Sequence, residues 1–167
     1  MASNPEGSER SGPANAYEAA ILEQKRHIER QQSGVVVIKS EDRPWQQARQ
    51  GKLKYYLIPS LHPETVLQSW RVFTHEITTQ SGKHRHQGGV SIYVLEGKGY
   101  TVADGKRVDW EAGDLIVLPL KPGGVDHQHF NPTPDTPCKW MAFLYMPYRF
   151  ATVTELEQKQ LDPQYKP

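Results

Sequence analysis

Short apolar runs separated by turn residues dominate the chain after Gly34. Runs rich in Val, Ile, Tyr and Trp and punctuated by Gly, Pro and Asp favour strands over helices. Asp104-Gly105 has the chemistry of a tight hairpin turn, and residues 131–137 have that of a longer hairpin loop. The pattern predicts an all-β sandwich or small barrel, with strands at residues 35–38, 53–58, 70–79, 91–96, 99–104, 107–111, 114–118, 127–131 and 139–148.

The chain before these strands has a different pattern. Residues 16–34 are rich in helix-forming side chains, with a sparse apolar stripe that includes Tyr17 and Ile28. This stretch predicts a peripheral helix that packs across the barrel or against a second subunit. Residues 1–15 predict a disordered tail, because few of them can bury apolar surface. We then expect the barrel over residues 35–150, and a C-terminal tail with room for a short helix over residues 151–167.

Composition excludes several classes of partner. The length of 167 residues fits one domain. A balance of 20 Lys and Arg against 19 Asp and Glu predicts binding to neither nucleic acid nor an anionic membrane surface. No stretch approaches the roughly 18 apolar residues of a membrane span, and the first residues lack a secretory pattern, so we expect a cytoplasmic protein. The lone Cys138 is interpreted as a small buried hydrophobe.

Two His-x-His pairs are the strongest chemical signal. Residues two apart in a strand point to the same face, so His84 and His86 can project together, roughly 6.5–7 Å apart. A metal site needs a further nitrogen, for which His127 and His129 on another strand are candidates. A single histidine is more often structural than ligating, but two such pairs in an all-β pattern predict a metal site.

The same residues resemble the two motifs of the cupin family. The first motif, a glycine, a His-x-His pair and a closing glycine, is matched by residues 82–99. The second motif, Pro-x-Gly-x-x-His-x-x-x-Asn, is matched by residues 122–131. The resemblance covers about residues 81–131. It implies a double-stranded β-helix, the jelly-roll-like cupin barrel, with three metal ligands, His84, His86 and His127.

One departure from the family pattern changes the expected chemistry. The family's glutamate ligand should fall near Gly89 or Val90, and neither residue can bind a metal. Glu96 is the next carboxylate, but it lies at the hairpin before Gly97. Three neutral imidazoles leave a divalent ion near +2, which favours an anionic bidentate ligand. An octahedral iron with three facial ligands also keeps three positions for a chelating substrate and O2.

Three-histidine cupins that resemble this pattern include gentisate and salicylate ring-cleaving dioxygenases, β-diketone-cleaving dioxygenases and thiol dioxygenases. The resemblance implies a homodimeric iron(II) dioxygenase that cleaves a small anionic chelating substrate, above all an aromatic hydroxy acid, with O2. A non-redox lyase, isomerase or hydrolase with zinc, manganese or nickel is an alternative. A non-enzymatic small-molecule-binding cupin is another. No phosphate-cradling glycine loop precedes a helix, so no nucleotide cofactor is expected.

Side chains that could anchor an acid beside the metal should lie on inward strand faces. Arg71 and His75 are four residues apart and therefore share one face of their strand. Tyr93 and Trp140 also have suitable chemistry. Arg85 lies between two predicted ligands and should point away from the metal.

His129 leaves two interpretations open. It shares the strand face of His127, so it is a candidate hydrogen-bond donor beside the metal or an alternative ligand. A core histidine with satisfied hydrogen bonds explains it equally well. His129, Arg71 and His75 are the candidate catalytic residues.

Overall fold

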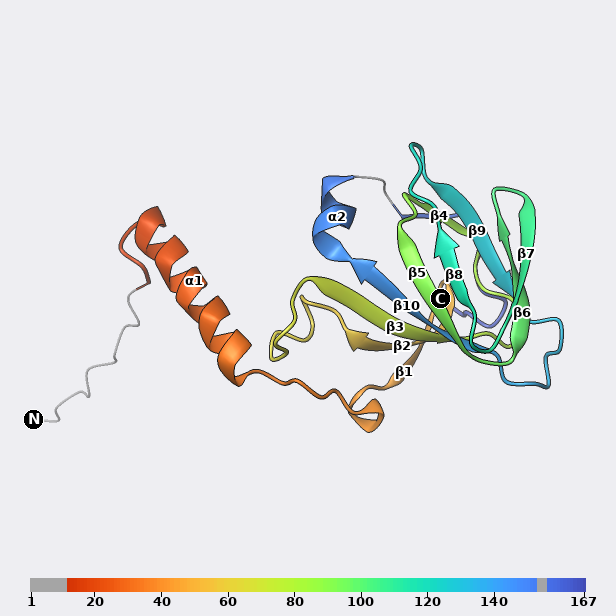
Figure 1. The fold of residues 1–167 in the computed structure, drawn as a ribbon, viewed down its shortest axis with the longest axis horizontal. Coiled ribbons are helices and arrows are strands. Elements are labelled where there is room, and N and C mark those ends of the chain that lie inside the picture. Colours follow the sequence, from red (N-terminus) through yellow and green to blue (C-terminus); the bar gives the residue numbers. More distant parts are fainter. Residues whose placement is uncertain (1–11, 153–155) are drawn as a thin grey trace, which may run out of the picture.

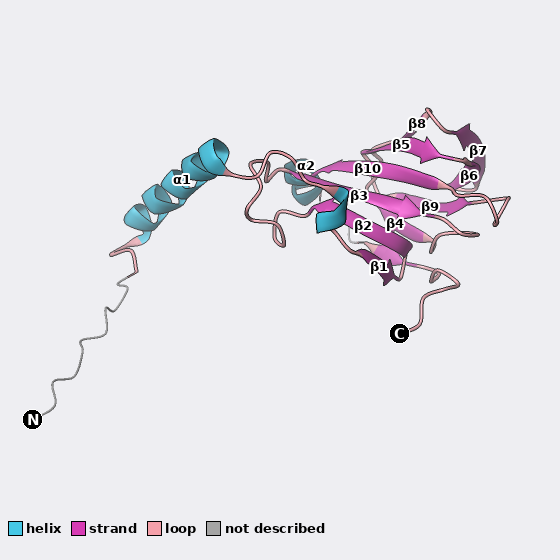
Figure 2. Cartoon of the chain, turned by 90° about the horizontal axis from the view of Figure 1, so that it is seen from below, coloured by secondary structure: helices cyan, strands magenta, loops and turns pink. Residues whose placement is uncertain are grey.

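Two antiparallel sheets face each other in the computed structural model, which describes residues 12–152 and 156–167 (Figures 1 and 2). The predicted all-β class is confirmed. One sheet has the order β1 (Trp45–Ala48), β2 (Gly51–Leu57), β3 (Trp70–Glu76), β10 (Lys139–Tyr145), β5 (Val90–Glu96) and β8 (Leu115–Leu118). The other has the order β11 (Glu157–Gln158), β4 (His84–His86), β9 (Val125–Phe130), β6 (Lys98–Ala103) and β7 (Lys106–Glu111).

The hydrophobic core lies between the two sheets and follows strand alternation. In β5, Val90, Ile92 and Val94 are buried while the residues between them are exposed. Trp110 from β7 and Trp140 from β10 belong to the same core cluster. Because alternate side chains of a strand face opposite sides, this pattern sets which residues of each strand reach the interior.

Of the two hairpin connections that the sequence predicts, the structure has one. Residues 131–137 join β9 to β10, which lie in different sheets, so the longer hairpin predicted there is wrong. A tight turn connects β6 to β7, as predicted. Asp104 and Gly105 both have positive φ, of 48° and 81°, between β6 and β7. That geometry is the one a two-residue hairpin turn requires, and it matches the right-handed twist of the strands. The predicted Asp-Gly hairpin is therefore confirmed.

The predicted strand at residues 35–38 is wrong. Only Val35 forms a bridge, with Thr65, and Val36 and Val37 are 77% and 74% exposed. Their β-branched side chains have strand propensity, but no neighbouring strand supplies hydrogen bonds along this stretch. Conversely, β1 was not predicted, because its sequence WQQA has no apolar alternation.

The end of the chain also differs from the prediction. The strand predicted for residues 139–148 stops at Tyr145, where helix α2 (Met146–Ala151) begins with a proline in its first turn. Pro147 has no backbone N–H for a sheet ladder but suits a helix start. The predicted tail over residues 151–167 is wrong in its described part, because β11 pairs with β4 and Asp162 is buried. The suggested short helix there includes residues 153–155, which lie outside the described residues.

Helix α1 (Ala16–Ser33) confirms the predicted N-terminal helix but not its packing across the barrel. It begins after Asn15, whose side chain accepts a hydrogen bond from the N–H of Glu18. None of its residues is buried, and it points away from the sheets (Figure 1). A short 3-10 turn, η1 (Ser40–Asp42), follows before β1. Most of the predicted tail over residues 1–15 lies outside the described residues.

Within the described ranges, no helix combines the length and the apolarity that are needed to cross a membrane.

The lack of burial in α1 makes its contribution to barrel stability testable. We expect deletion of residues 1–34 to shift the thermal unfolding midpoint by less than about 2 °C, because changes outside the packed core cost within about 0.5 kcal/mol. Circular dichroism measures the midpoint. The substitution Ile92→Ala, at a side chain only 2% exposed, is the control and should cost about 2–5 kcal/mol. A deletion as damaging as this control would show that α1 packs against the barrel or a second copy.

Candidate metal centre

Two paired strands bring the predicted metal ligands together. In the register of β4 and β9, His84 lies directly opposite His127, and His86 lies opposite Val125. His84, His86 and His127 are all buried, whereas Arg85 between the first two faces outward. Residues opposite each other in an antiparallel pair have side chains on the same face, so the three imidazoles project into the barrel interior.

The three imidazole rings are close enough to share one ion. The ring centroid of His127 lies 4.1 Å from that of His84 and 4.6 Å from that of His86. One nitrogen from each ring lies within 4.8 Å of the others. No carboxylate belongs to this group among the described residues, as the missing family glutamate predicts. Neutral imidazole is a common ligand of divalent transition metals, so the donor set fits a metal.

Backbone hydrogen bonds orient two of these rings. Nδ1 of His84 donates to the carbonyl of Gly82, and Nδ1 of His127 donates to the carbonyl of Val125, each over 3.1 Å. Both rings therefore carry their proton on Nδ1 and present the lone pair of Nε2. His86 differs, since its Nδ1 accepts from the N–H of Gly88 over 3.1 Å. Its Nε2 is thus protonated in this arrangement, and ligation through Nε2 would require that bond to be released.

Burial keeps these histidines neutral. It lowers the pKa of His86 from 6.5 to about 3, and repulsion from His84, whenever that ring is protonated, and from Arg149 adds to the effect. It also lowers the pKa of His84 and, more strongly, that of His127. A ligand nitrogen must be unprotonated to bind a metal, so at neutral pH protons compete weakly for this site.

His129 lies beside this group rather than in it. Its Nδ1 is 2.7 Å from the hydroxyl of Thr101, and that hydroxyl accepts from Nε1 of Trp110 over 2.9 Å. The Thr101 hydroxyl can donate its proton to Nδ1 of His129, and in that arrangement the His129 proton lies on Nε2. The ring centroid lies 5.5 Å from that of His127. Of the two interpretations left by the sequence, this geometry favours a hydrogen-bonded residue that packs beside the candidate ligands.

His75 and Trp140 line the interior next to this cluster. The two residues are opposite each other in β3 and β10, and their ring centroids are 4.8 Å apart. His75 is fully buried, and Gly51 makes room for it, because a Cβ at Gly51 would lie 2.1 Å from its Nε2. Tyr93, in contrast, is 44% exposed on the outer face of β5, so its predicted position beside the metal is wrong.

A cavity of about 270 Å³ opens beside His86. Arg71 and Phe73 of β3 line it, as their shared strand face predicts, while His75 lies deeper in the interior. Arg149 of α2 also lines it and was missed by the sequence analysis. No sequence motif includes Arg149. It lies in the short, mostly apolar stretch MPYRFA, whose beginning was predicted to be the end of a strand.

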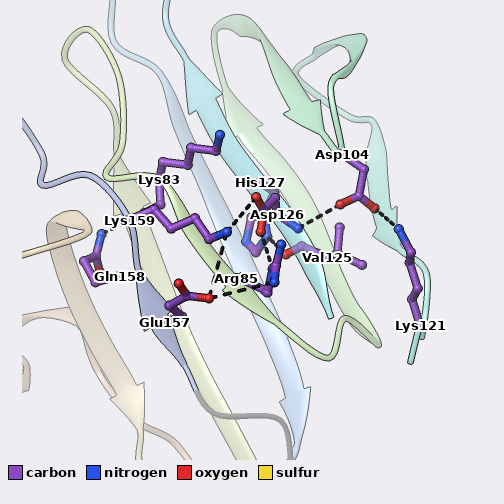
Figure 3. A network of polar contacts seen from close by, with 10 residues as sticks. All are labelled: Lys83, Arg85, Asp104, Lys121, Val125, Asp126, His127, Glu157, Gln158 and Lys159. Atoms are coloured by element: carbon purple, nitrogen blue, oxygen red, sulfur yellow. Dashed lines mark hydrogen bonds and ion pairs between the residues drawn. The ribbon is translucent and has the colours of Figure 1, made fainter. Parts of the chain in front are cut away.

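A network of ion pairs lies on the outer face of the strands that carry the histidines (Figure 3). Arg85 of β4 donates to the carboxylate of Asp126 in β9, as its predicted outward direction requires. Lys159, which follows β11, donates to the other oxygen of Asp126 over 3.1 Å. The network joins three neighbouring strands, and so connects the C-terminal segment to the backbone that positions His84, His86 and His127.

Comparison with known proteins identifies the same architecture. A family model described as "Cupin domain" matches residues 72–144. The polyketide cyclase RemF from Streptomyces resistomycificus superposes with a TM-score of 0.57 and 16% identity, over 77% of this chain and 88% of that chain. A Cupin 2 conserved barrel domain protein from Salinispora arenicola CNS-205 superposes with a TM-score of 0.54 and 23% identity, over 71% of this chain and 96% of that chain.

A salicylate 1,2-dioxygenase variant from Pseudoaminobacter salicylatoxidans superposes with a TM-score of 0.47 and 24% identity, over 61% of this chain and 29% of that chain. This likeness is too distant to bear on chemistry. The likenesses to RemF and to the Salinispora protein show the fold alone. No curated protein matches the sequence.

The hydrogen bonds of Thr101 make a testable contribution to stability. Thr101→Val should lower the free energy of unfolding by about 1–3 kcal/mol, because Nε1 of Trp110 and Nδ1 of His129 lose their buried partner. Urea denaturation measures this change. Thr133→Val, at an exposed threonine, should leave the free energy nearly unchanged. Equal effects of the two substitutions would contradict the arrangement around His129.

The buried neutral state of His75 predicts a pH dependence for the metal-free protein. Burial lowers the pKa of His75 from 6.5 to about 3, so between these values the unfolded chain binds a proton that the folded chain does not. Stability is therefore full above about pH 6.5 and falls towards pH 3, by about 1.4 kcal/mol per pH unit for one such group. Urea denaturation at pH 7 and pH 5 should show a smaller decrease for His75→Gln. An identical decrease in both proteins would contradict the prediction.

Proposed function

Because a cupin-domain family model matches residues 72–144 and the chain has the cupin fold, we propose that it is a metal-dependent dioxygenase whose His84, His86 and His127 hold iron(II). Its substrate is a small anionic molecule that chelates the metal, an aromatic hydroxy acid above all, and O2 is the second substrate. The single observation that supports this function is a cluster of three buried neutral histidines without a carboxylate among the described residues.

Iron(II) held by three histidines supplies open coordination positions and one-electron chemistry for O2. The protein itself supplies position and environment. Two of the ligand rings are held by backbone carbonyls before any metal binds, so little reorganisation is needed at those positions. Phe73 and Leu144 give the adjoining cavity apolar walls, which orient a ring and limit water.

The charge of the site favours an anionic substrate. The donor atoms are neutral, so the charge of a divalent ion stays uncompensated by its ligands. Among the described residues, no Asp or Glu lines the adjoining cavity. A substrate that brings its own negative oxygens would balance this charge, and it would occupy two neighbouring coordination positions.

A second candidate function keeps the metal without redox chemistry. Three histidines also suit zinc, and manganese or nickel could occupy the same site in a lyase, isomerase or hydrolase. Metal analysis of the purified protein separates the two, because retained zinc without iron favours the non-redox function. A non-enzymatic binding protein would bind such ligands without turnover.

Oxygen consumption tests the proposed dioxygenase directly. The protein is loaded with iron(II) without oxygen, and O2 uptake is then measured with gentisate, salicylate and a β-diketone. We expect uptake with one of these compounds. His127→Ala should reduce uptake by at least about 100-fold, since even residues that only orient a ligand contribute about 10–100-fold.

His27→Ala is the matched control, because His27 is an exposed residue of α1 far along the chain from the metal site. This variant should keep the full rate of uptake. No uptake with any of the three compounds, in protein that demonstrably holds iron, would count against the dioxygenase function.

A further inference from the structure

Two arginines from separate elements meet in the cavity beside His86. Arg71 comes from β3 and Arg149 from α2, and both side chains are half-buried. The candidate ligand His86 lines the same cavity. The two arginines and one candidate metal ligand therefore border the same small volume.

Neither guanidinium has an ionic partner within the described residues. Arg43, Arg85 and Arg107 are each paired with a carboxylate, at Glu64, Asp126 and Asp109. Arg71 and Arg149 take part in no such pair, and Nε of Arg71 is buried without a hydrogen-bond partner. A buried donor without a partner is costly, as is a half-buried cation without an anion.

The two charges also repel each other. Both line one cavity, and burial together with the charge of Arg71 lowers the pKa of Arg149. Arg49, an exposed residue, adds a third positive charge to the same lining, and none of the acidic side chains that the structure describes lines the cavity with them. A ligand with a negative group would relieve this repulsion and would satisfy Nε of Arg71.

We propose that Arg71 and Arg149 bind a carboxylate of the substrate at the end opposite the oxygens that chelate the metal. The inference rests on the proposed function, since it assumes that the metal holds the other end. The preferred substrate is then an acid with two separate anionic ends, rather than a chelator with one. Arginine suits this role, because its planar fork can donate two parallel hydrogen bonds to one carboxylate.

The size and walls of the cavity limit the rest of the molecule. Its volume of about 270 Å³ lies near the lower end of small-molecule sites. Tyr55 and Phe73 lie in its wall, with ring centroids 5.3 Å apart. A cavity of this volume suits a single aromatic ring or a short chain of similar length.

Paired probes that differ by one carboxylate test this subsite. Cobalt(II)-loaded protein, which keeps the same coordination chemistry without oxidation, is titrated with catechol and with 3,4-dihydroxybenzoate, and the cobalt absorption bands report binding. We expect the second probe to bind at least about tenfold tighter, the equivalent of 1.4 kcal/mol. In Arg71→Gln and Arg149→Gln the ratio should fall towards one, while catechol still binds.

One control tests whether the loss of any arginine changes the ratio, and a second separates the charge of Arg71 from the geometry of its guanidinium. Arg107→Gln removes an exposed arginine that is paired with Asp109, so it should keep the wild-type ratio. Arg71→Lys keeps the charge but loses the fork, and it should restore part of the preference. Equal binding of the two probes by the unmodified protein, or a preference that survives both Gln substitutions, would overturn the proposal.

A second titration makes the test independent of the metal. Metal-free protein is titrated with benzoate and with its neutral analogue benzamide, and NMR shifts report binding. Benzoate should bind tighter, and both Gln substitutions should abolish the difference. If catechol does not bind cobalt-loaded protein but this preference holds, the metal function fails and the carboxylate subsite stands. If catechol binds but neither titration shows a preference, the subsite fails and the metal function stands.

Discussion

The antiparallel pairing of β4 with β9 is the constraint on which the rest of the site depends. It places His84 opposite His127 and directs both rings, with that of His86, into the barrel. Burying three imidazoles together is favourable only while they stay neutral, so the interior holds their pKa values below the ordinary range. The site is thereby ready for a cation and unfavourable for protons at neutral pH.

The elements around this pair reinforce it from both faces. Outside, Arg85, Asp126 and Lys159 join β4, β9 and the C-terminal segment through ion pairs (Figure 3). Inside, Thr101 and Trp110 hold His129 against the neighbouring ring. Exposed ion pairs contribute little energy each, whereas the buried hydrogen bonds are costly to lose. The positions of the histidine rings therefore depend more on the interior contacts than on the ion pairs at the surface.

Charge links the metal centre to the adjoining cavity. Neutral ligands leave the charge of a bound ion uncompensated, and the cavity adds the cations of Arg71 and Arg149, which have no ionic partner in the part of the chain that the structure describes. The bound ion and the two arginines both favour an anionic ligand, because a negative group stabilises each of these positive charges more than water alone does. The apolar wall formed by Phe73 and Leu144 strengthens this effect by lowering the local dielectric. An acid with two charged ends suits the whole space.

Local patterns in the sequence determined the all-β class, the Asp104-Gly105 turn and the inward direction of His84, His86 and His127, since strand alternation and turn chemistry act between near neighbours. Contacts between distant residues were decided only by the tertiary structure. Pairing of β11 with β4 turned a predicted tail into a strand, and α2 brought Arg149 to the cavity. Val36 and Val37 stayed exposed because no strand lies beside them. Propensity cannot reveal a partner that is remote in the chain.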